Sequence, residues 1–262
     1  MSPDATEGAG GGPPPGGGFP GADGPAASTG NSPANRLADA LRRITAVAVG
    51  QPLPEEVVDE AAGRAAAVAD RLEAAAAASK QRRNVPKADG HPQDIFPTSP
   101  LIGFANAVAP PVEVWAVLGE GGRREIRGRV TFGYAYEGPP TCVHGGVIAE
   151  LFDELLGISN IVVDQGAMTG TLTIRYRKPT PLLAPLELVA RHTGRDGRKV
   201  YAWGGIYHRG ELTAEAEGTF VDVPPNRMLD IVTGNAGGSE APLVDPDWQR
   251  LMREAAGEDA AS

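Results

Sequence analysis

A loop that runs into a helix carries the residues of this sequence that are best suited to catalysis. Between Pro139 and Gly157, two prolines keep the chain extended, Gly145 and Gly146 follow, and apolar residues then recur at helical spacing. The first N–H groups of a helix have no partner within it, and the helix dipole leaves that end partly positive. Gly145 and Gly146 can therefore donate to a carbonyl oxygen that gains charge, and larger side chains would keep a substrate away.

A carboxylate follows on the same predicted helix. Four apolar residues at helical spacing mark its buried side, Val147, Ile148, Leu151 and Leu155. Asp153 lies on the flank away from them, about 240° around the axis from Val147. A carboxylate there can act as a general base or as a nucleophile. Gly157 predicts the C-terminal end of this helix.

These residues resemble the hotdog-fold acyl-CoA thioesterases, and within them the PaaI-type branch. The motif of that branch is His-Gly-Gly with an acidic residue nine positions after the His, and it is matched here by His144, Gly145, Gly146 and Asp153. The preceding Tyr136-Glu137-Gly138-Pro139-Pro140 is similar to the loop before the motif in the mammalian acyl-CoA thioesterase members. The resemblance covers roughly residues 96 to 225.

A second matching segment is Thr169 to Pro179, which looks like the next strand of the family, with a hydroxyl residue ten positions before the proline. The resemblance implies that the thioester carbonyl lies against the N–H of Gly146, with Gly145 shaping the approach. It also implies that His144 is a positioning residue before the glycines, with direct proton transfer by His144 as the alternative. Asp153, from the partner chain of a dimer, would activate water or attack the carbonyl directly, and Thr169 would orient the water. The sequence leaves both routes open.

The motif departs from the family at one position. Many PaaI-type members have an Asn six residues before the His, and this chain has Gly138 there. The resemblance therefore favours the branch with the Glu-Gly-Pro-Pro loop, which is associated with acyl chains, over the aryl-thioester branch. With few aromatic residues available, we expect an acyl pocket of aliphatic side chains and a medium to long acyl chain.

Basic side chains after the motif are candidates for binding the phosphates of coenzyme A. They are Arg175, Arg177 and Lys178 of the predicted strand, and Arg198 of the following hairpin. The alternative is a solvated, charged strand edge that discourages aggregation.

Composition excludes several classes of function. The net charge of −9 and the absence of a basic run argue against nucleic-acid binding. No metal-ligand spacing, P-loop or dinucleotide motif in a strand-to-helix context occurs, so we expect no cofactor. The single cysteine, with no signal peptide and no apolar run of 18 residues, favours a cytoplasmic protein without a membrane span.

Two helices are predicted ahead of the motif. Ser32 and Pro33 predict a helix start, Gly50 its end, and Pro54 with two glutamates the start of a second helix. The alanine-rich seam of the second helix buries little area, so we expect the pair to dock on the main domain or on a second subunit, as a structural cap, a lid or a dimer clamp.

The remaining elements predict an α+β hotdog fold, in which an antiparallel sheet wraps around a central helix. Strands are predicted at 112–118, 124–132, 171–178, 186–192, 199–208 and 212–223. The predicted domains are a disordered Gly/Pro-rich tail (1–33), a helical hairpin and linker (34–95), a hotdog domain (96–230) and a polar C-terminal tail (231–262).

The predicted function is hydrolysis of acyl-CoA to free acid and CoA, within fatty acid metabolism, by a homodimer or a dimer of dimers. Two alternatives stay open, because the same scaffold also hosts hydratases and non-catalytic ligand binders. The first is a hotdog hydratase, and the second is an acyl-CoA-binding or assembly module.

Overall fold

The structure, a computed structural model, describes residues 32–78, 93, 96–163 and 165–224. Three predicted segments lie outside the described residues. They are the tail 1–33 except for its last two residues, most of the linker before residue 96, and the C-terminal tail.

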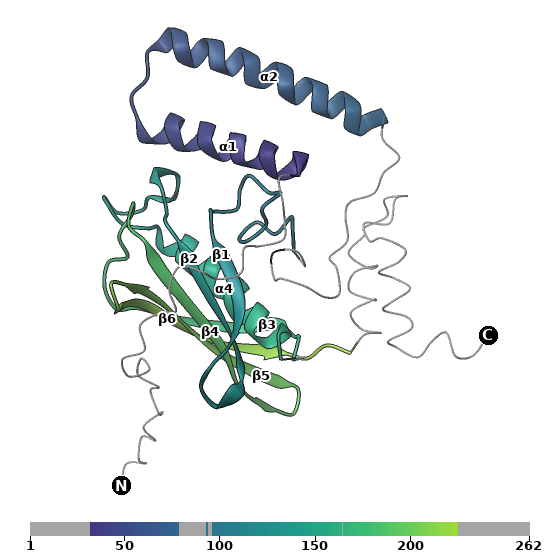
Figure 1. The fold of residues 1–262 in the computed structure, drawn as a ribbon, viewed down its shortest axis with the longest axis vertical. Helices are drawn as coiled ribbons and strands as arrows, with labels where there is room; N and C mark the ends of the chain where they lie inside the picture. Colours follow the sequence, from purple (N-terminus) through teal and green to yellow (C-terminus); the bar gives the residue numbers. More distant parts are fainter. Residues whose placement is uncertain (1–31, 79–92, 94–95, 164, 225–262) are drawn as a thin grey trace, which may run out of the picture.

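One six-stranded antiparallel sheet forms the main body, with the strand order β1-β2-β4-β5-β6-β3 (Figure 1). Its strands are β1 (Glu113–Leu118), β2 (Arg124–Val130), β3 (Met168–Tyr176), β4 (Leu186–Asp196), β5 (Lys199–His208) and β6 (Glu211–Val221). β3 precedes β4, β5 and β6 in the chain, yet it pairs with β6 at the edge of the sheet. Within the described residues, β3 therefore has a strand on one side only.

The strands form where polar and apolar residues alternate and where the turns fit. In β6, Ala214, Ala216 and Phe220 are buried, whereas Glu217, from the opposite face, is exposed. β5 turns tightly into β6 through Arg209 and Gly210, which both have positive φ (52° and 77°), as two-residue hairpin turns require.

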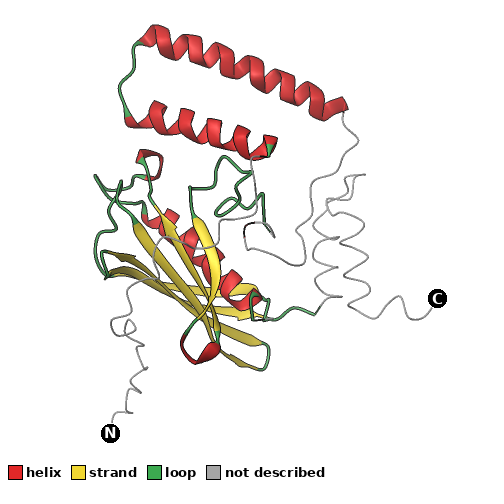
Figure 2. Ribbon diagram, in the orientation of Figure 1, coloured by secondary structure: helices red, strands yellow, loops and turns green. Residues whose placement is uncertain are grey.

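Helix α4 (Gly145–Ile161) lies against one face of this sheet (Figure 2). Six of its apolar residues are buried in the core, namely Ile148, Leu151, Phe152, Leu155, Leu156 and Ile158. Two strand glycines permit the close approach, because a Cβ at Gly204 or Gly218 would lie 2.8 or 2.9 Å from a methyl group of Leu156.

The predicted end of this helix at Gly157 is wrong. α4 continues to Ile161, and Ile158, Ser159 and Asn160 are all buried. Gly157 faces Phe220, whose ring would lie 3.9 Å from an added Cβ. A glycine inside a helix costs only about 1 kcal/mol, which the burial of the last turn outweighs.

Two helices precede the sheet, α1 (Pro33–Gly50) and α2 (Glu55–Ala78), and they run antiparallel (Figure 1). The Ser32 side chain accepts a hydrogen bond from the N–H of Asn35 (3.1 Å), which confirms the predicted N-cap. α1 docks on the main body, where Arg42 donates to the carbonyl oxygens of Phe104 and Asn106. α2 has no buried residue in the described part of the chain, so the expected docking is found for α1 alone.

The antiparallel sheet packed around one helix confirms the α+β class, and the six predicted strands are all present. β4 runs further than predicted, to Asp196, because a β-bulge between His192 and Gly194 lets the strand pairing continue. The predicted domain boundaries stay predictions.

Candidate active site

The His-Gly-Gly motif lies where an anchored loop becomes α4. The N–H of His144 donates to the carbonyl oxygen of Tyr136 (2.8 Å). The carboxylate of Glu137 accepts from the N–H of Thr141 (2.8 Å), a residue held at a φ of 65°. These bonds fix the direction from which the chain enters the helix.

His144 is the N-cap of α4, and its Nδ1 accepts a hydrogen bond from the N–H of Gly146 at 3.0 Å. An accepting Nδ1 carries no proton, so the proton of the neutral ring is on Nε2. The N–H predicted to polarise a carbonyl is therefore engaged by the histidine. Since His144 is exposed, its ring has room to turn away and free this N–H for a substrate.

Side chains added at the glycines around His144 would meet neighbours at different distances. A Cβ at Gly146 would lie 3.0 Å from Nδ1 of His144, and one at Gly145 would lie 3.4 Å from the hydroxyl of Tyr176. A Cβ at Gly138 would lie 2.7 Å from Cα of His144. A side chain at position 138 would therefore require the backbone at His144 to shift.

Tyr176, at the end of β3, is a contact that the sequence did not single out. Its hydroxyl donates to the carbonyl oxygen of Gly145 (2.8 Å) and so holds the start of α4 against the sheet. The only signal was its place inside the matching strand segment.

Asp153 lies half-buried in the middle of α4. It follows Gly146 by seven residues, which is nearly two full turns, so the two residues share one face of the helix about 10 Å apart along its axis. A single carbonyl group cannot contact both at hydrogen-bond distance. Within one chain, the predicted donor and the predicted carboxylate therefore do not converge.

Glu154, next to Asp153 on α4, is half-buried and hydrogen-bonded. The hydroxyl of Ser99 donates to its Oε1 (2.8 Å), which ties the loop before β1 to α4. Burial raises the pKa of the Glu154 carboxyl above its ordinary value, the hydrogen bond from Ser99 lowers it, and the negative charge of Asp153 raises it again. The two neighbouring carboxyls are therefore electrostatically coupled.

Thr169 is exposed near the start of β3, beside a β-bulge. Tyr176, which contacts Gly145, lies seven residues further along the strand, about 23 Å away at strand spacing. Thr169 and the start of α4 are therefore at opposite ends of β3 in one chain.

The predicted phosphate-binding residues lie in two separate places, and each has a partner. Arg175 pairs with Glu217 (2.9 Å), Arg177 with Glu215, and Lys178 with Glu211, all beside β6. Arg198 donates from Nε and a terminal nitrogen to the carbonyl oxygen of Asp222 (3.1 Å each), near the other end of β3.

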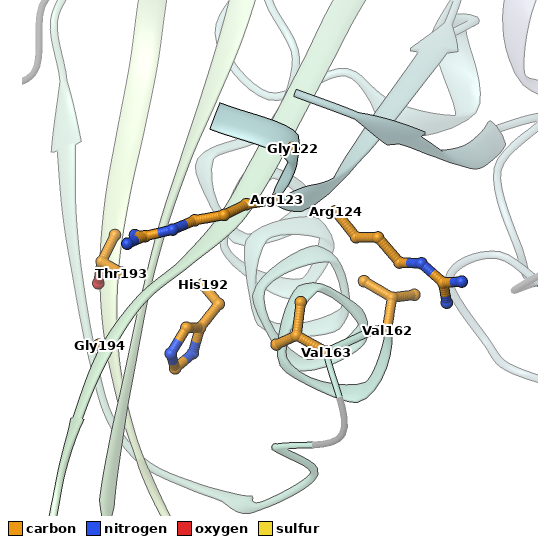
Figure 3. A pocket seen from close by; sticks show the side chains of 8 residues that line it. All are labelled: Gly122, Arg123, Arg124, Val162, Val163, His192, Thr193 and Gly194. Atoms are coloured by element: carbon orange, nitrogen blue, oxygen red, sulfur yellow. The ribbon is translucent and has the colours of Figure 1, made fainter. Parts of the chain in front are cut away.

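A hollow of about 630 Å³ lies at the opposite end of α4 from the His-Gly-Gly motif (Figure 3). Its walls include Arg123, Val162 and His192 and none of the predicted catalytic residues. Among the described residues, no group of three His, Cys, Asp or Glu side chains could hold a metal ion. No helix in the described ranges is both long and apolar enough to span a membrane.

Comparison with known proteins gives two kinds of relative, while no protein-family model matches the chain. The chain is 33% identical over 91 residues to the acyl-coenzyme A thioesterase THEM4 of Xenopus laevis, and 34% identical over 100 residues to that of Mus musculus. These segments cover 34% and 37% of this chain and 41% and 43% of the relatives. The chain thus spans about two-fifths of the length of the curated relatives it matches.

The crystal structure of a thioesterase superfamily protein is similar over a larger share. It has 32% sequence identity and a TM-score of 0.65, and the match covers 73% of this chain and 92% of that chain. The match is longer than the segment from β1 to β6, so the likeness extends beyond the sheet and α4. The chain has the hotdog fold, and it belongs to the thioesterase superfamily.

Proposed function

We propose that this chain hydrolyses acyl-CoA thioesters to free acid and CoA in an active site shared by two copies. The observation that carries the proposal is the placement of His144 and Gly146 at the start of α4, with Asp153 on the same face two turns on. Membership of the thioesterase superfamily supports it, as do the THEM4 relatives, which are named acyl-coenzyme A thioesterases.

A second copy is needed because the predicted residues do not converge in one chain. β3 is an exposed edge strand, and such an edge is a natural place for another strand to pair. Two antiparallel copies of β3 would place the Thr169 end of one strand beside the Tyr176 end of the other. Since Tyr176 holds Gly145, this pairing brings Thr169 to the His-Gly-Gly motif of the second copy.

The chemistry begins with an exchange of hydrogen bonds at the start of α4. The N–H of Gly146 leaves Nδ1 of His144 and donates to the thioester carbonyl oxygen, which gains negative charge as the carbonyl is attacked. Gly145 leaves room for the thioester. His144 acts as a positioning residue, because it caps the helix when the site is empty.

Asp153 of the second copy supplies the carboxylate in either of two routes. As a base, it takes a proton from a water molecule that Thr169 orients, the hydroxide adds to the carbonyl carbon, and the CoA thiolate leaves. As a nucleophile, it attacks the carbonyl carbon directly, the C–S bond breaks and the CoA thiolate leaves, and water then hydrolyses the acyl-aspartyl anhydride to the free acid and the Asp153 carboxylate.

The phosphates of CoA would replace carboxylate partners at the surface. Arg175, Arg177 and Lys178 lie at the end of β3 that holds Gly145, where a bound thioester would place the CoA part outward. The ion pairs of Arg175 and Lys178 are exposed and therefore weakened by solvent screening, so a phosphate competes readily for these two cations. The same antiparallel pairing brings Arg198 of the second copy towards this end.

We also propose for this chain the finer properties that the family resemblance implies. The chain belongs to the PaaI-type branch with the Glu-Gly-Pro-Pro loop, and its substrate has a medium to long acyl chain. It forms a homodimer or a dimer of dimers and acts in fatty acid metabolism in the cytoplasm. We further propose the predicted division into two tails, a helical hairpin with linker, and a thioesterase domain at 96–230.

The test is release of free thiol from a panel of short, medium, long and aromatic acyl-CoAs by wild type and Asp153→Asn. Glu150→Gln is the matched control, because Glu150 is an exposed carboxylate on the same helix. We expect turnover by wild type and the control and a collapse in Asp153→Asn. Binding of acyl-CoA by the wild-type dimer without any thiol release would refute the proposal and support a binding module.

A further inference from the structure

The hollow at the C-terminal end of α4 is built by three separate parts of the chain (Figure 3). Arg123 directly precedes β2 and Arg124 begins it, Val162 and Val163 follow α4, and His192 and Thr193 belong to β4. With a volume of about 630 Å³, the hollow has the size of a small-molecule site.

A β-bulge arranges the polar wall of this hollow. Successive strand residues normally point to opposite faces, yet His192 and Thr193 both line the hollow. The register of β4 against β5 shifts between His192 and Gly194, so Thr193 is the extra residue of the bulge. Bulges often re-aim a side chain next to a functional site, and this one places Thr193 on the wall of the hollow together with His192.

Positive charge at the hollow is not neutralised by the described residues. Among the residues that the structure describes, no ion pair or hydrogen bond is found for the side chains of Arg123 and Arg124. The guanidinium group of Arg123 extends towards Thr193, whereas that of Arg124 extends the other way, past Val162 (Figure 3). Arg123 and Thr193 thus form a polar end, and Val162 and Val163 form an apolar side.

A buried polar pair supports the same wall. Nδ1 of His192 lies 3.0 Å from Oδ1 of Asn160, a fully buried residue of the last turn of α4. Because a carboxamide oxygen only accepts, Nδ1 carries the proton and Nε2 of the neutral ring is left as an acceptor. Nδ2 of Asn160 is buried and has no hydrogen-bond partner among the described residues. Burial, and then the positive charge of Arg123, lower the pKa of the His192 imidazole, which keeps the ring neutral.

We propose that this hollow binds a small carboxylic acid in its anionic form, with the carboxylate between Arg123 and Thr193 and a short alkyl chain on Val162 and Val163. A guanidinium group and a hydroxyl match the two oxygens of a carboxylate. The apolar side favours an acid with an alkyl tail over a bare inorganic anion. The site is separate from the His-Gly-Gly motif, and binding there does not require that the chain hydrolyse thioesters.

The test is isothermal titration calorimetry of the full chain with hexanoate, 1-hexanol and inorganic phosphate. We expect hexanoate to bind more tightly than either of the other two, because only hexanoate has both the charge and the tail. Arg123→Gln is expected to weaken hexanoate binding about 10- to 100-fold, the range for a lost charge-assisted hydrogen bond. Arg64→Gln, on the exposed face of α2, is the matched control and should bind as wild type does.

A second measurement locates the ligand. The ring ¹⁵N signals of His192 are expected to shift when hexanoate is added to wild type and to stay in place in Arg123→Gln. Undiminished hexanoate binding by Arg123→Gln, or the absence of any hexanoate binding, would overturn the proposal. Phosphate binding as tight as that of hexanoate would overturn the assignment to an alkyl carboxylate.

Discussion

A histidine lies at each end of α4, but the two histidines differ in their burial and in their hydrogen-bond partners. At the N-terminal end, an exposed histidine caps the helix by accepting from Gly146, and the carboxylate at Asp153 lies about two turns away. At the C-terminal end, a half-buried histidine pairs with the buried Asn160 beside an open hollow that one chain lines by itself. The proposed mechanism at the first end needs a second copy, whereas the hollow at the second end is lined by residues of one chain. Catalysis should therefore depend on assembly, and binding at the hollow should not.

The largest expected effect comes from the carboxylate of the N-terminal half. Asp153→Ala should reduce turnover about 10²- to 10⁴-fold, because it removes the proposed base or nucleophile. The measurement is steady-state thiol release, with circular dichroism and thermal unfolding to confirm that the variant is folded. Turnover close to wild type in a folded Asp153→Ala protein would remove Asp153 from the mechanism.

Mixing two inactive variants tests whether one site needs two chains. Asp153→Ala lacks the carboxylate, and Gly146→Val blocks the approach to the helix N-terminus at an exposed position. If each site takes Gly146 from one chain and Asp153 from the other, half of the sites in a mixed dimer regain both residues. A random mixture should then recover about a quarter of wild-type turnover after the two proteins are unfolded and refolded together. Recovery no greater than the sum of the two variants alone would place the whole site in one chain.

The cap at the N-terminal end should contribute mainly to stability. His144→Ala should lower the free energy of unfolding by about 0.5–2 kcal/mol, measured in urea, because the N–H of Gly146 loses its partner. His144→Asn is the control, since asparagine is a favourable N-cap and should restore most of the loss. We expect turnover of His144→Ala to fall less than about tenfold, and a fall of about 10²-fold or more would instead identify His144 as a proton-transfer group.

The smallest expected effect is the pH dependence that Glu154 gives to stability. Its folded-state pKa is raised above the ordinary value of 4.5, so the folded chain binds this proton more tightly than the unfolded chain. The free energy of unfolding should therefore fall as the pH rises from about 4.5 through the raised folded-state pKa. Because one group exchanges at most one proton, the free energy of unfolding changes by less than about 1.4 kcal/mol per pH unit.

Glu154→Gln tests this slope, because glutamine keeps an acceptor for Ser99 but does not titrate. Urea unfolding at several pH values should show that the free energy of unfolding depends less on pH in Glu154→Gln than in wild type. At pH values above the folded-state pKa of Glu154, the variant should be the more stable of the two. Asp153→Asn should lower the pKa of Glu154, measured from the ¹³C shift of its carboxyl, because a repelling charge is gone. An unchanged Glu154 pKa in that variant would disprove the coupling of the two carboxyls.

Local sequence patterns predicted a structural feature correctly where that feature depends only on neighbouring residues in the chain. Ser32 before Pro33 predicted a helix start that the structure confirms with an N-cap hydrogen bond. Gly157 gave the wrong helix end, because burial of the following residues against the sheet outweighs the helix preference of one glycine. The proposed roles of His144, Gly146, Asp153 and Thr169 stay predictions for the experiments above.

The sequence alone determined the elements, because hydrophobic periodicity and turn residues are local properties of a chain. It also determined which residue types could do chemistry, and it placed Gly146 and Asp153 on one helix. Only the tertiary structure decided that the N–H of Gly146 bonds to His144, that Glu154 is held by Ser99, and that Thr169 lies at the far end of β3 from the motif. Likewise, the pairing of His192 with Asn160 spans 32 residues. Such contacts depend on the order of strands in the sheet and on which helix face is buried, and no local pattern specifies either.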